Sequence, residues 1–521
     1  MKEKERTTLR KIEYHRKESF YLIVRGIEVG IFAGLVSVLY RYCLTYAEKL
    51  LHLFTEFAKG SWYRYAIFFA IIILLALIVS RIVKWENMAS GSGIPQVSGE
   101  IKGHLSQNWI RVIFAKIIGG TLSVFSGLSL GREGPSIQLG AMTGKGIARI
   151  TKADKTTELR MISCGGGAGL AGAFNAPLAG MMFVLEEIHK TIDKSIICMG
   201  LVSCIVADFV SKIFFGQDNI FSYETTNIPL RYYWLIVILG VLLGVLGCGY
   251  NIVMSKVQDL FKYFSKIPSS VKLIFVFILG GIVALTLPEI TGGGHKMVTL
   301  LLLERPETAV LAGLLIAKFL FSAISFGSGA PGGIFFPLLI LGTYIGAIYA
   351  NVVIPMFNLN EILWQEFVVV SMAGIFASIV RAPLTGIILV FEMTGNLESL
   401  LPLATVSLIS YAVANLLGVN PIYETLLEKI ISSNPKKPEF HSKNEKLLRE
   451  FIVPVGSKIN NKAVGDIDWG KHCLIVSIER DGVSITPKGD TLIKDGDELL
   501  ILVSQRRLSR DNERLEKIIN G

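Results

Sequence analysis

The residues best suited to chemistry form the stretch Gly131-Arg132-Glu133-Gly134-Pro135, a charged pair between segments apolar enough to lie in a membrane. Glycines disfavour regular helix through the pair, and Pro135 suits the first position of a helix that begins beside Glu133. The unpaired N–H groups of a helix start attract anions, and ionisable groups inside membranes are functional candidates. The stretch therefore predicts an anion site first occupied by the Glu133 carboxylate. The alternative is a simple salt bridge with Arg132 at the membrane interface.

Three further stretches have the same design, a flexible or polar lead-in followed by a proline near a predicted helix start. They are Gly91-Ser92-Gly93-Ile94-Pro95, Gly332-Gly333-Ile334-Phe335-Phe336-Pro337 and Asn420-Pro421-Ile422-Tyr423. Several helix N-termini that meet at one point bind an anion through partial charges, which permits faster release than a full lysine or arginine charge. The hydroxyls of Ser92 and Tyr423 supply further donors. Taken singly, each stretch is equally well explained as an ordinary helix break.

The composition indicates a helical protein with many membrane spans. Of 521 residues, 51% are apolar, 18% are charged and 51 are glycine, as expected for closely packed membrane helices. The net charge of +10 lies largely in residues 2–17 and in short loops, which indicates a cytoplasmic N-terminus and not a nucleic-acid partner. The six cysteines lack the spacing of a metal site or a disulfide framework, so neither a metal nor a bound cofactor is expected in the membrane part.

The elements that must position these residues follow from the apolar runs. Residues 1–18 predict a basic amphipathic helix on the cytoplasmic membrane surface. Several later runs are too long for one span or contain Gly and Pro, which predicts broken and tilted helices that meet inside the membrane. The runs cover 20–44, 63–83, 109–130, 161–188, 195–215, 232–254, 272–287, 309–325, 333–356, 366–394 and 398–417.

The two halves of this region repeat one another, over approximately residues 19–217 and 230–420. The pattern Pro135-x3-Leu139-Gly140-x3-Gly144 recurs from Pro337 to Gly346, and Ala176-Pro177-Leu178-Ala179-Gly180 recurs as Ala382-Pro383-Leu384-Thr385-Gly386, with Glu186 and Glu392 at equal distances beyond. Two matches in the same order indicate duplicated halves. Duplicated halves with interrupted helices are typical of transporters, whose binding site lies where the halves meet.

The composition becomes polar and strand-like beyond about residue 434. Strands are predicted from Lys446 onward, at Cys473–Arg480, Val483–Pro487 and Glu498–Ser504, with a hairpin turn at Asp481-Gly482. These signals predict a small cytoplasmic α+β domain over 445–506, followed by a polar tail over 507–521.

In combination, the motifs GSGIP, GREGP and GGIFFP with the late Tyr423 resemble the CLC family of chloride channels and chloride/proton exchangers, from about residue 18 to 435. The resemblance implies an all-α polytopic membrane domain over 19–437, with two inverted helical repeats and broken helices. It also implies a homodimer with one anion pathway per subunit. The expected location is the lipid bilayer of a bacterial plasma membrane, with both termini cytoplasmic.

The resemblance also assigns the site. It implies that Ser92 and Tyr423 line a central chloride site together with the backbone N–H groups of Ile334 and Phe335, and that Glu133 is the gating glutamate that competes with chloride at the outer site. The full set of anion-binding residues expected on this basis is Ser92, Gly134, Ile334, Phe335, Phe336 and Tyr423.

One position separates exchangers from channels. Glu187 matches the family's internal proton-transfer glutamate, an acid that channels often lack, so exchange of chloride for protons is favoured over a passive gated channel. As an alternative, Glu186 and Glu187 simply cap a helix end. Ser92 stands at the position where nitrate-preferring exchangers carry proline. Pro135 and Glu187 match the family pattern at two positions where the fluoride-exporting branch carries other residues. Chloride is therefore the expected substrate, with bromide and nitrate tolerated.

Two other classes of function are less well supported. Cation transport or ligand sensing would account for the C-terminal domain, but no potassium-filter-like sequence is present and helix N-termini repel cations. An enzyme is not expected, because no Ser/His or paired-aspartate arrangement suits intramembrane catalysis.

The C-terminal domain resembles the TrkA-C (RCK C-terminal) ligand-binding domain, not the paired CBS domains of many eukaryotic CLC proteins. The resemblance implies that the domain pairs across the dimer and binds a small cytoplasmic nucleotide there, with cyclic di-AMP favoured. An adenine nucleotide, or a dimerisation module without a ligand, are the alternatives.

Overall fold

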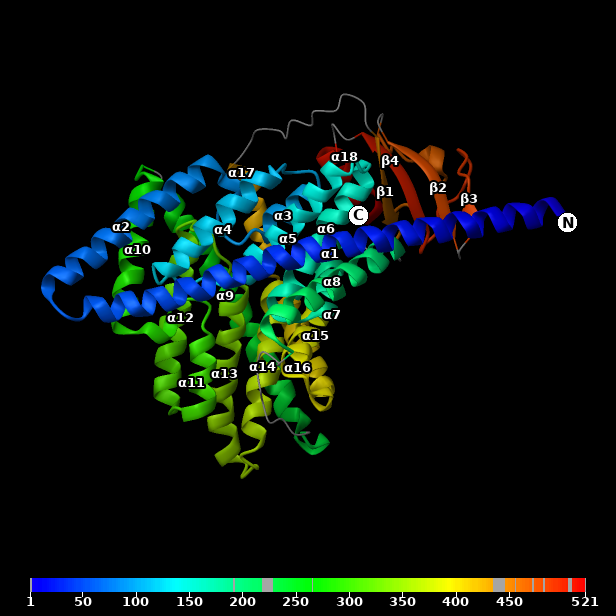
Figure 1. Ribbon diagram of the computed structural model, residues 1–521. Coiled ribbons are helices and arrows are strands. Elements are labelled where there is room, and N and C mark those ends of the chain that lie inside the picture. Colours follow the sequence, from blue (N-terminus) through cyan, green and yellow to red (C-terminus); the bar gives the residue numbers. More distant parts are fainter. Residues whose placement is uncertain are drawn as a thin grey trace. The chain divides into compact units, whose positions relative to one another are not determined.

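A computed structural model describes the chain except for short gaps, over residues 2–190, 193–217, 228–264, 266–433, 446–454, 456–470, 473–480, 483–504 and 508–520 (Figure 1). The chain divides into two compact units. The membrane unit comprises Met1–Ser98, Gln107–Lys152 and Arg160–Lys429, and the second unit comprises Gly99–Ser106, Ala153–Leu159 and Ile430–Gly521. The predicted turn at Asp481-Gly482 lies outside the described residues.

The membrane unit is helical throughout. Its helices are α1 (Lys2–Ala58), α2 (Trp62–Trp85), α3 (Ile94–Ile101), α4 (Trp109–Phe125), α5 (Glu133–Ile150), α6 (Lys155–Phe174), α7 (Pro177–Phe183), α8 (Lys194–Phe215), α9 (Tyr233–Tyr263), α10 (Ser269–Thr286), α11 (His295–Glu304), α12 (Thr308–Gly327), α13 (Phe335–Met356), α14 (Leu363–Val380), α15 (Pro383–Thr394), α16 (Leu400–Leu416) and α17 (Ile422–Ser433). Among the described residues, 8 helical segments are long and apolar enough to cross a membrane. The prediction of an all-α polytopic membrane domain is confirmed.

The first helix differs from the expected boundary. α1 is continuous from Lys2 to Ala58, so no break near residue 18 separates the basic segment from the first apolar span. The sequence gives the reason, because no proline or glycine precedes Gly26 and the segment is rich in helix-forming Glu, Lys, Arg and Leu. The position of this segment on the membrane surface stays a prediction.

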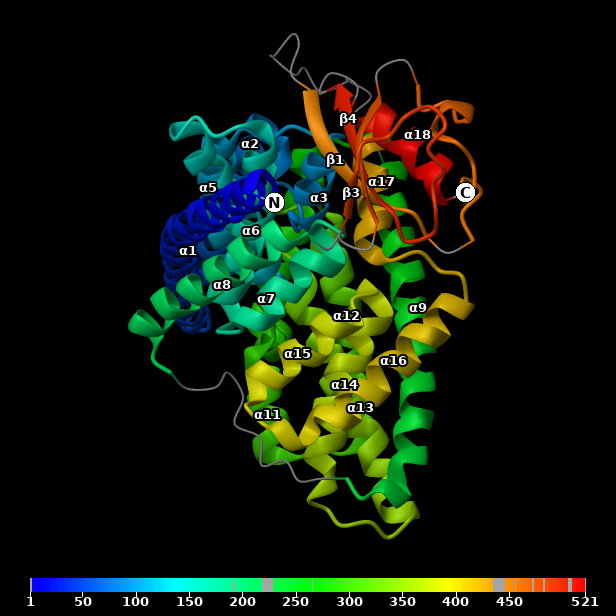
Figure 2. The ribbon, with the colours of Figure 1, turned by 90° about the vertical axis from the view of Figure 1, so that its right-hand side faces the viewer.

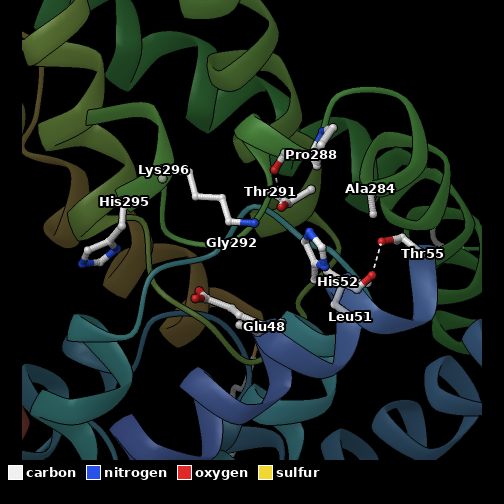
Figure 3. A pocket seen from close by; sticks show the side chains of 12 residues that line it. Glu48, Leu51, His52, Thr55, Ala284, Pro288, Thr291, Gly292, His295 and Lys296 are labelled. Carbon is white, nitrogen blue, oxygen red and sulfur yellow. Dashed lines mark hydrogen bonds between the residues drawn. The ribbon is translucent and has the colours of Figure 1, made fainter. Parts of the chain in front are cut away.

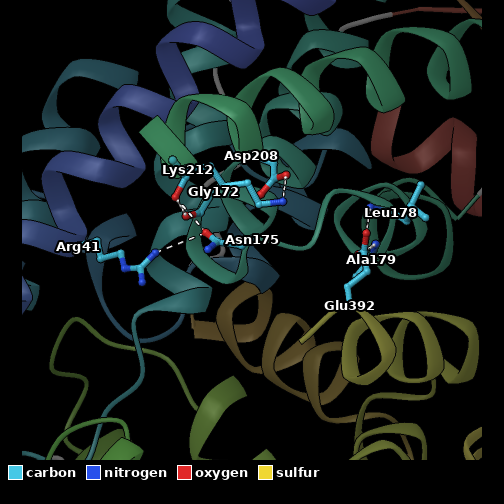
Figure 4. A network of polar contacts seen from close by, with 9 residues as sticks. Arg41, Gly172, Asn175, Leu178, Ala179, Asp208, Lys212 and Glu392 are labelled. Atoms are coloured by element: carbon cyan, nitrogen blue, oxygen red, sulfur yellow. Dashed lines mark hydrogen bonds and ion pairs between the residues drawn. The ribbon is translucent and has the colours of Figure 1, made fainter. Parts of the chain in front are cut away.

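Two of the long apolar runs are broken at equivalent points of the repeat. Asn175 separates α6 from α7 and Arg381 separates α14 from α15, with positive φ angles of 52° and 70°. Each is followed by Ala-Pro, which ends a helix at the preceding residues. The first break is fixed by hydrogen bonds to the Asn175 side-chain oxygen from Arg41 (3.5 Å) and Ser211 (3.1 Å) (Figure 4).

The interior of the second repeat is built around α13 and α14, whose residues are almost all buried. α14 lies beside α13 and α16 (Figure 2). A Cβ at Gly346 would lie 2.6 Å from the Phe367 carbonyl oxygen, so glycine permits the close approach of these helices. Such small-residue contacts are the usual basis of helix association in membranes.

The second unit contains a four-stranded antiparallel sheet in the order β1-β4-β2-β3. The strands are β1 (Lys446–Ile452), β2 (Leu474–Arg480), β3 (Val483–Ile485) and β4 (Glu498–Ser504). Their positions agree with the alternating patterns in the sequence. β1 pairs with β4 from Lys446↔Ser504 to Ile452↔Glu498, so the two ends of the domain are hydrogen-bonded to each other.

The segment predicted as a polar tail at 507–521 is helical over most of its length. Residues Leu508–Asn520 form helix α18, which packs on the sheet (Figure 2). Leu515 and Ile519 belong to the same buried cluster as Ile501 and Val503 of β4. The i, i+4 spacing of these two apolar residues within a charged segment is the signal of an amphipathic helix.

A buried ion pair fixes the edge of this domain. Arg480 donates two hydrogen bonds of 2.7 Å to Asp497, whose side chain is fully buried, and the Lys494 N–H donates a third of 2.8 Å. Burial opposes ionisation of Asp497, but the hydrogen bonds from Arg480 and Lys494 outweigh it and lower the pKa of this carboxyl.

Candidate functional site

Three of the four proline-containing stretches meet through their backbones. Gly131 and Gly333 pair with each other, with N–H···O distances of 2.7 and 2.8 Å. The Gly332 N–H donates to the Gly91 carbonyl oxygen at 3.0 Å. The loops before α3, α5 and α13 are therefore held together, and the two halves of the repeat meet at the predicted place.

The helix starts are offset slightly from the prediction. α5 begins at Glu133 and α13 begins at Phe335, so Pro135 and Pro337 each occupy the third helical position and not the first. The N–H of the third residue also lacks an acceptor within the helix, so a proline there removes no hydrogen bond. Because both repeats have the same offset, their first turns present equivalent backbone groups.

Ser92 lies against the start of α5. Its side chain is buried, and its hydroxyl has no hydrogen-bond partner within the described part of the chain. A Cβ at Gly134 would collide with Ser92 Oγ, so only glycine allows this approach. Ser92 thus has a buried donor beside a helix N-terminus, as an anion site requires.

Tyr423 supplies a second buried hydroxyl. It is the second residue of α17, and its oxygen also lacks a partner among the residues the structure describes. The loop before α17 is fixed by a hydrogen bond of 3.2 Å from Asn251 to the Asn420 carbonyl oxygen. The Tyr423 hydroxyl lies within electrostatic range of both Glu133 and Glu187.

The start of α13 provides the third component. Ile334, Phe335 and Phe336 are fully buried, and the first N–H groups of a helix have no acceptor within it. Phe335 packs between Phe183 and Phe376, with ring-centroid distances of 5.8 and 4.9 Å. These aromatic contacts hold the first residue of α13 in the protein interior.

The Glu133 carboxylate lies at this junction and is fully buried. Arg132 Nε is 3.6 Å from Glu133 Oε1, and the backbone N–H groups of Glu133 and Phe336 face the carboxylate. Neither oxygen has a hydrogen-bond partner among the residues that the structure describes, so the interaction is mainly electrostatic. The carboxylate itself therefore faces N–H groups at the starts of α5 and α13.

Glu133 also faces a cavity of about 480 Å³. Arg41, Arg132 and His295 line the cavity, so several donors and positive charges lie along the approach to the carboxylate. The His295 ring stacks on Phe336 with centroids 4.1 Å apart, and its Nε2 is 3.4 Å from Arg132 Nη2. Figure 3 shows the adjoining smaller cavity, which shares Glu48 and His295 with the first.

Glu187 is not part of this cluster. It lies on the π-helical turn η2 (Val184–Ile188) and is 3% exposed. Its carboxylate forms an ion pair with Lys190, 3.5 Å between Oε2 and Nζ. Of the predicted site residues, the structure thus brings Ser92 to Gly134 and joins the loop before α13 to the loops before α3 and α5, whereas Glu187 lies on a separate turn.

The neighbouring Glu186 has a structural role that mirrors that of Glu392. Glu186 accepts hydrogen bonds from the N–H groups of Leu384 (3.1 Å) and Thr385 (2.7 Å) at the start of α15. Glu392 accepts them from Leu178 (3.0 Å) and Ala179 (2.8 Å) at the start of α7 (Figure 4). Each half of the repeat therefore caps a helix of the other. Glu186 therefore caps a helix, but at the start of α15 in the other half and not at the cytoplasmic end of its own helix.

Two buried lysines were missed by sequence reasoning. Lys116 donates to the carbonyl oxygens of Ala89 (2.9 Å) and Gly91 (2.7 Å), and Lys318 donates to those of Ile290 (2.9 Å) and Gly292 (3.0 Å). Each lysine precedes the proline of its repeat by 19 residues. That equal spacing, and a lysine within an apolar run, were the signals that could have identified them.

The fold and the site define a polytopic membrane transport protein in which two duplicated, inverted halves enclose an anion-attracting junction. The Voltage gated chloride channel family matches residues 75–415, and the TrkA-C domain matches residues 448–511. The chain belongs to the voltage-gated chloride channel (CLC) family and carries a C-terminal TrkA-C domain.

Curated relatives and solved structures agree. The chain is 34% identical over 458 residues to the H(+)/Cl(-) exchange transporter ClcA of Vibrio cholerae, covering 84% of this chain and 93% of the relative. It is 30% identical over 452 residues to ClcA of Salmonella gallinarum, covering 84% and 95%. The structure of a slow cyanobacterial Cl⁻/H⁺ antiporter has a TM-score of 0.75 at 31% identity, covering 80% of this chain and 99% of that one. A eukaryotic CLC transporter, with a TM-score of 0.67 at 23% identity and coverage of 79% and 74%, shares the fold.

Proposed function

We propose that this protein is a secondary active transporter that exchanges chloride for protons across the membrane. The observation that carries the proposal is the buried Glu133 carboxylate, which faces the N–H groups at a helix start where chloride would otherwise bind. A group that competes with the anion only when ionised links anion movement to protonation. The names of the relatives, H(+)/Cl(-) exchange transporters and a Cl⁻/H⁺ antiporter, support the same activity.

The anion site follows from the buried donors. Ser92 and Tyr423 donate their hydroxyls to chloride, and the N–H groups of Ile334 and Phe335 at the start of α13 complete the shell. Gly134 and Phe336 contribute backbone at the outer part of the site. Chloride and Glu133 then alternate there, and protonation of Glu133 releases it from the N–H groups.

Protons reach the opposite end of the pathway through Glu187. This buried carboxylate is an acid–base group rather than an anion ligand, and it lies within electrostatic range of Tyr423. The protein is accordingly a transporter and not an enzyme. It works as a homodimer in a bacterial cell membrane, with both termini in the cytoplasm.

Reconstituted liposomes test the proposal. The reversal potential is measured under opposed chloride and proton gradients, with mock-reconstituted liposomes as the control. A coupled exchanger gives a potential that depends on both gradients, and a chloride gradient drives protons uphill. A potential that follows chloride alone identifies a passive chloride channel and rejects exchange.

We further propose that the TrkA-C domain regulates transport. Two copies pair across the dimer and bind a small cytoplasmic nucleotide, with cyclic di-AMP as the favoured ligand. A ligand changes activity only if it binds two states of the transporter with different affinities, and a coupling of about 1–3 kcal/mol is typical.

Transport by the full chain is measured with cyclic di-AMP, with ATP and without nucleotide, beside a truncation that ends near Lys436. A cyclic di-AMP response that disappears in the truncation supports regulation through this domain. The same response in both proteins, or the absence of binding to the full chain, leaves the domain as an assembly module.

A further inference from the structure

The buried carboxylate of Glu187 is joined to an exposed one by a single ammonium group. Lys190 Nζ lies 3.5 Å from Glu187 Oε2 and 2.6 Å from Glu424 Oε1. The Glu187 side chain is 3% exposed, whereas that of Glu424 is 41% exposed. Lys190 therefore lies between a carboxylate inside the protein and one that meets solution.

Local structure directs Lys190 toward this position. Glu187 and Lys190 are three residues apart, and Lys190 adopts a left-handed backbone with φ of 59° just after the π-helical turn η2. Glu424 directly follows Tyr423 on α17. The Lys190 ammonium thus connects η2, the turn that carries Glu187, to α17, the helix that carries the buried hydroxyl of Tyr423.

The second repeat has no counterpart of this ion pair at the equivalent positions. Glu186 and Glu392 occupy equivalent positions and both cap helices. At the positions equivalent to Glu187 and Lys190, however, the second repeat carries Met393 and Asn396. Uncharged side chains occupy these positions in the second repeat. We therefore attribute a role other than folding to the charges in the first repeat.

We propose that Lys190 is a positioning residue for proton transfer, which keeps Glu187 in its ionised, proton-accepting form and is itself held in place by Glu424. A cation within about 4–6 Å favours the charged form of a carboxyl group, whereas burial disfavours it. The inference rests on the proposed proton-accepting role of Glu187.

Several other charged and titratable groups in the described neighbouring segments are paired with other residues or are uncharged. The groups are Glu186, which caps α15; His189, whose Nδ1 is 3.1 Å from Ser163 Oγ; Arg160 and Asp193, which pair at 3.0 Å; and the buried Tyr423. Lys190 is therefore the charge whose removal should change the ionisation of Glu187 most directly.

The proton affinity of Glu187 can be measured without transport. Infrared titration of the reconstituted full chain records the C=O stretch of a protonated carboxyl, and Glu187→Gln identifies the band that belongs to Glu187. In Lys190→Met, we expect the midpoint of this band to move to higher pH by about 1 unit or more. Lys190→Arg retains the charge and should restore the midpoint.

Transport provides the second readout. The ratio of proton to chloride flux is measured as a function of pH, and its midpoint should move in Lys190→Met in the same direction as the infrared band. In Glu424→Gln, Lys190 keeps its charge and a neighbouring negative charge is removed, so the midpoint should not move to higher pH as it does in Lys190→Met. In a Glu187→Gln background, Lys190→Met should cause no further change in the flux ratio.

Matched controls come from the same segments. Lys194→Met and Glu428→Gln each remove an exposed charge and should leave both midpoints at the wild-type values. An unshifted infrared midpoint in Lys190→Met, or an equal shift in Lys190→Arg, overturns the assignment. If wild-type protein moves no coupled protons, the proposed exchange fails, but the infrared midpoints still decide whether Lys190 controls Glu187.

Discussion

Replacing Lys116 with methionine should weaken chloride binding, although Lys116 makes no contact with the anion in the proposed site. Its ammonium donates to the carbonyl oxygens of Ala89 and Gly91, and Gly91 directly precedes Ser92. Methionine has a similar shape but no donor. The substitution therefore leaves two carbonyl oxygens without their buried partner and frees the loop that positions the Ser92 hydroxyl.

The size of the effect follows from these contacts. Each buried carbonyl that loses its partner costs about 1–3 kcal/mol, and relief of the desolvation cost of the buried ammonium offsets part of this. We expect a net loss of about 2–4 kcal/mol in the free energy of unfolding. Misplacement of one hydroxyl donor to an anion costs about 1.5 kcal/mol or more, which corresponds to a roughly tenfold weaker chloride affinity.

Lys318 is the matched control. It donates to two carbonyl oxygens at similar distances, 2.9 and 3.0 Å, in the equivalent loop of the second repeat. Lys318→Met should destabilise the protein by a similar amount, but its loop carries no proposed anion ligand, so chloride affinity should stay near the wild-type value.

Calorimetric chloride titration of purified protein and its thermal unfolding measure the two quantities. Unchanged chloride affinity in a destabilised Lys116→Met protein, or equal weakening in both variants, would refute the reasoning.

Three further substitutions test the site and the C-terminal domain. Glu133→Gln should abolish proton coupling and leave passive chloride flux, because a neutral side chain cannot compete as an anion; chloride-driven proton uptake by this variant in liposomes would contradict the gating role. Ser92→Pro should move anion preference from chloride toward nitrate, since it removes a buried hydroxyl donor; an unchanged selectivity series would leave Ser92 a purely structural role. Arg480 lowers the pKa of Asp497 in the folded protein. The ionised carboxylate therefore contributes its full stabilisation of the domain above about pH 4, and this stabilisation is lost as the pH falls through the pKa of the folded state. Asp497→Asn should therefore weaken amide protection in β4 at pH 7 more than at pH 3; equal weakening at both would show that the charge is unimportant.

Much of the candidate site was accessible from sequence because its features are local. A proline and glycines mark a helix start wherever they occur, so the beginnings of α3, α5, α13 and α17 could be placed to within two residues. The repeated spacing of small residues indicated two related halves. In the C-terminal domain, alternating apolar residues gave β2 and β4 nearly to the residue.

Local signals also left errors of a consistent kind. Pro135 was assigned to the first position of its helix, but the helix begins two residues earlier, because proline is tolerated throughout the first turn of a helix. Helix α18 was missed because only a few of its residues, among them Leu515 and Ile519, are buried. Their i, i+4 spacing was the available signal, but the cluster that buries them is formed with residues of distant strands.

Tertiary structure alone decided which groups meet. Glu186 caps a helix at Thr385, 199 residues further along the chain, and Gly131 pairs with Gly333 in the opposite half. In the same way, the resemblance to the CLC family implied that Glu187 accepts protons, but the sequence did not indicate that Lys190 pairs with both Glu187 and Glu424. Residue types and spacings determine what a segment can do, whereas contacts between distant segments depend on how the two halves pack against each other.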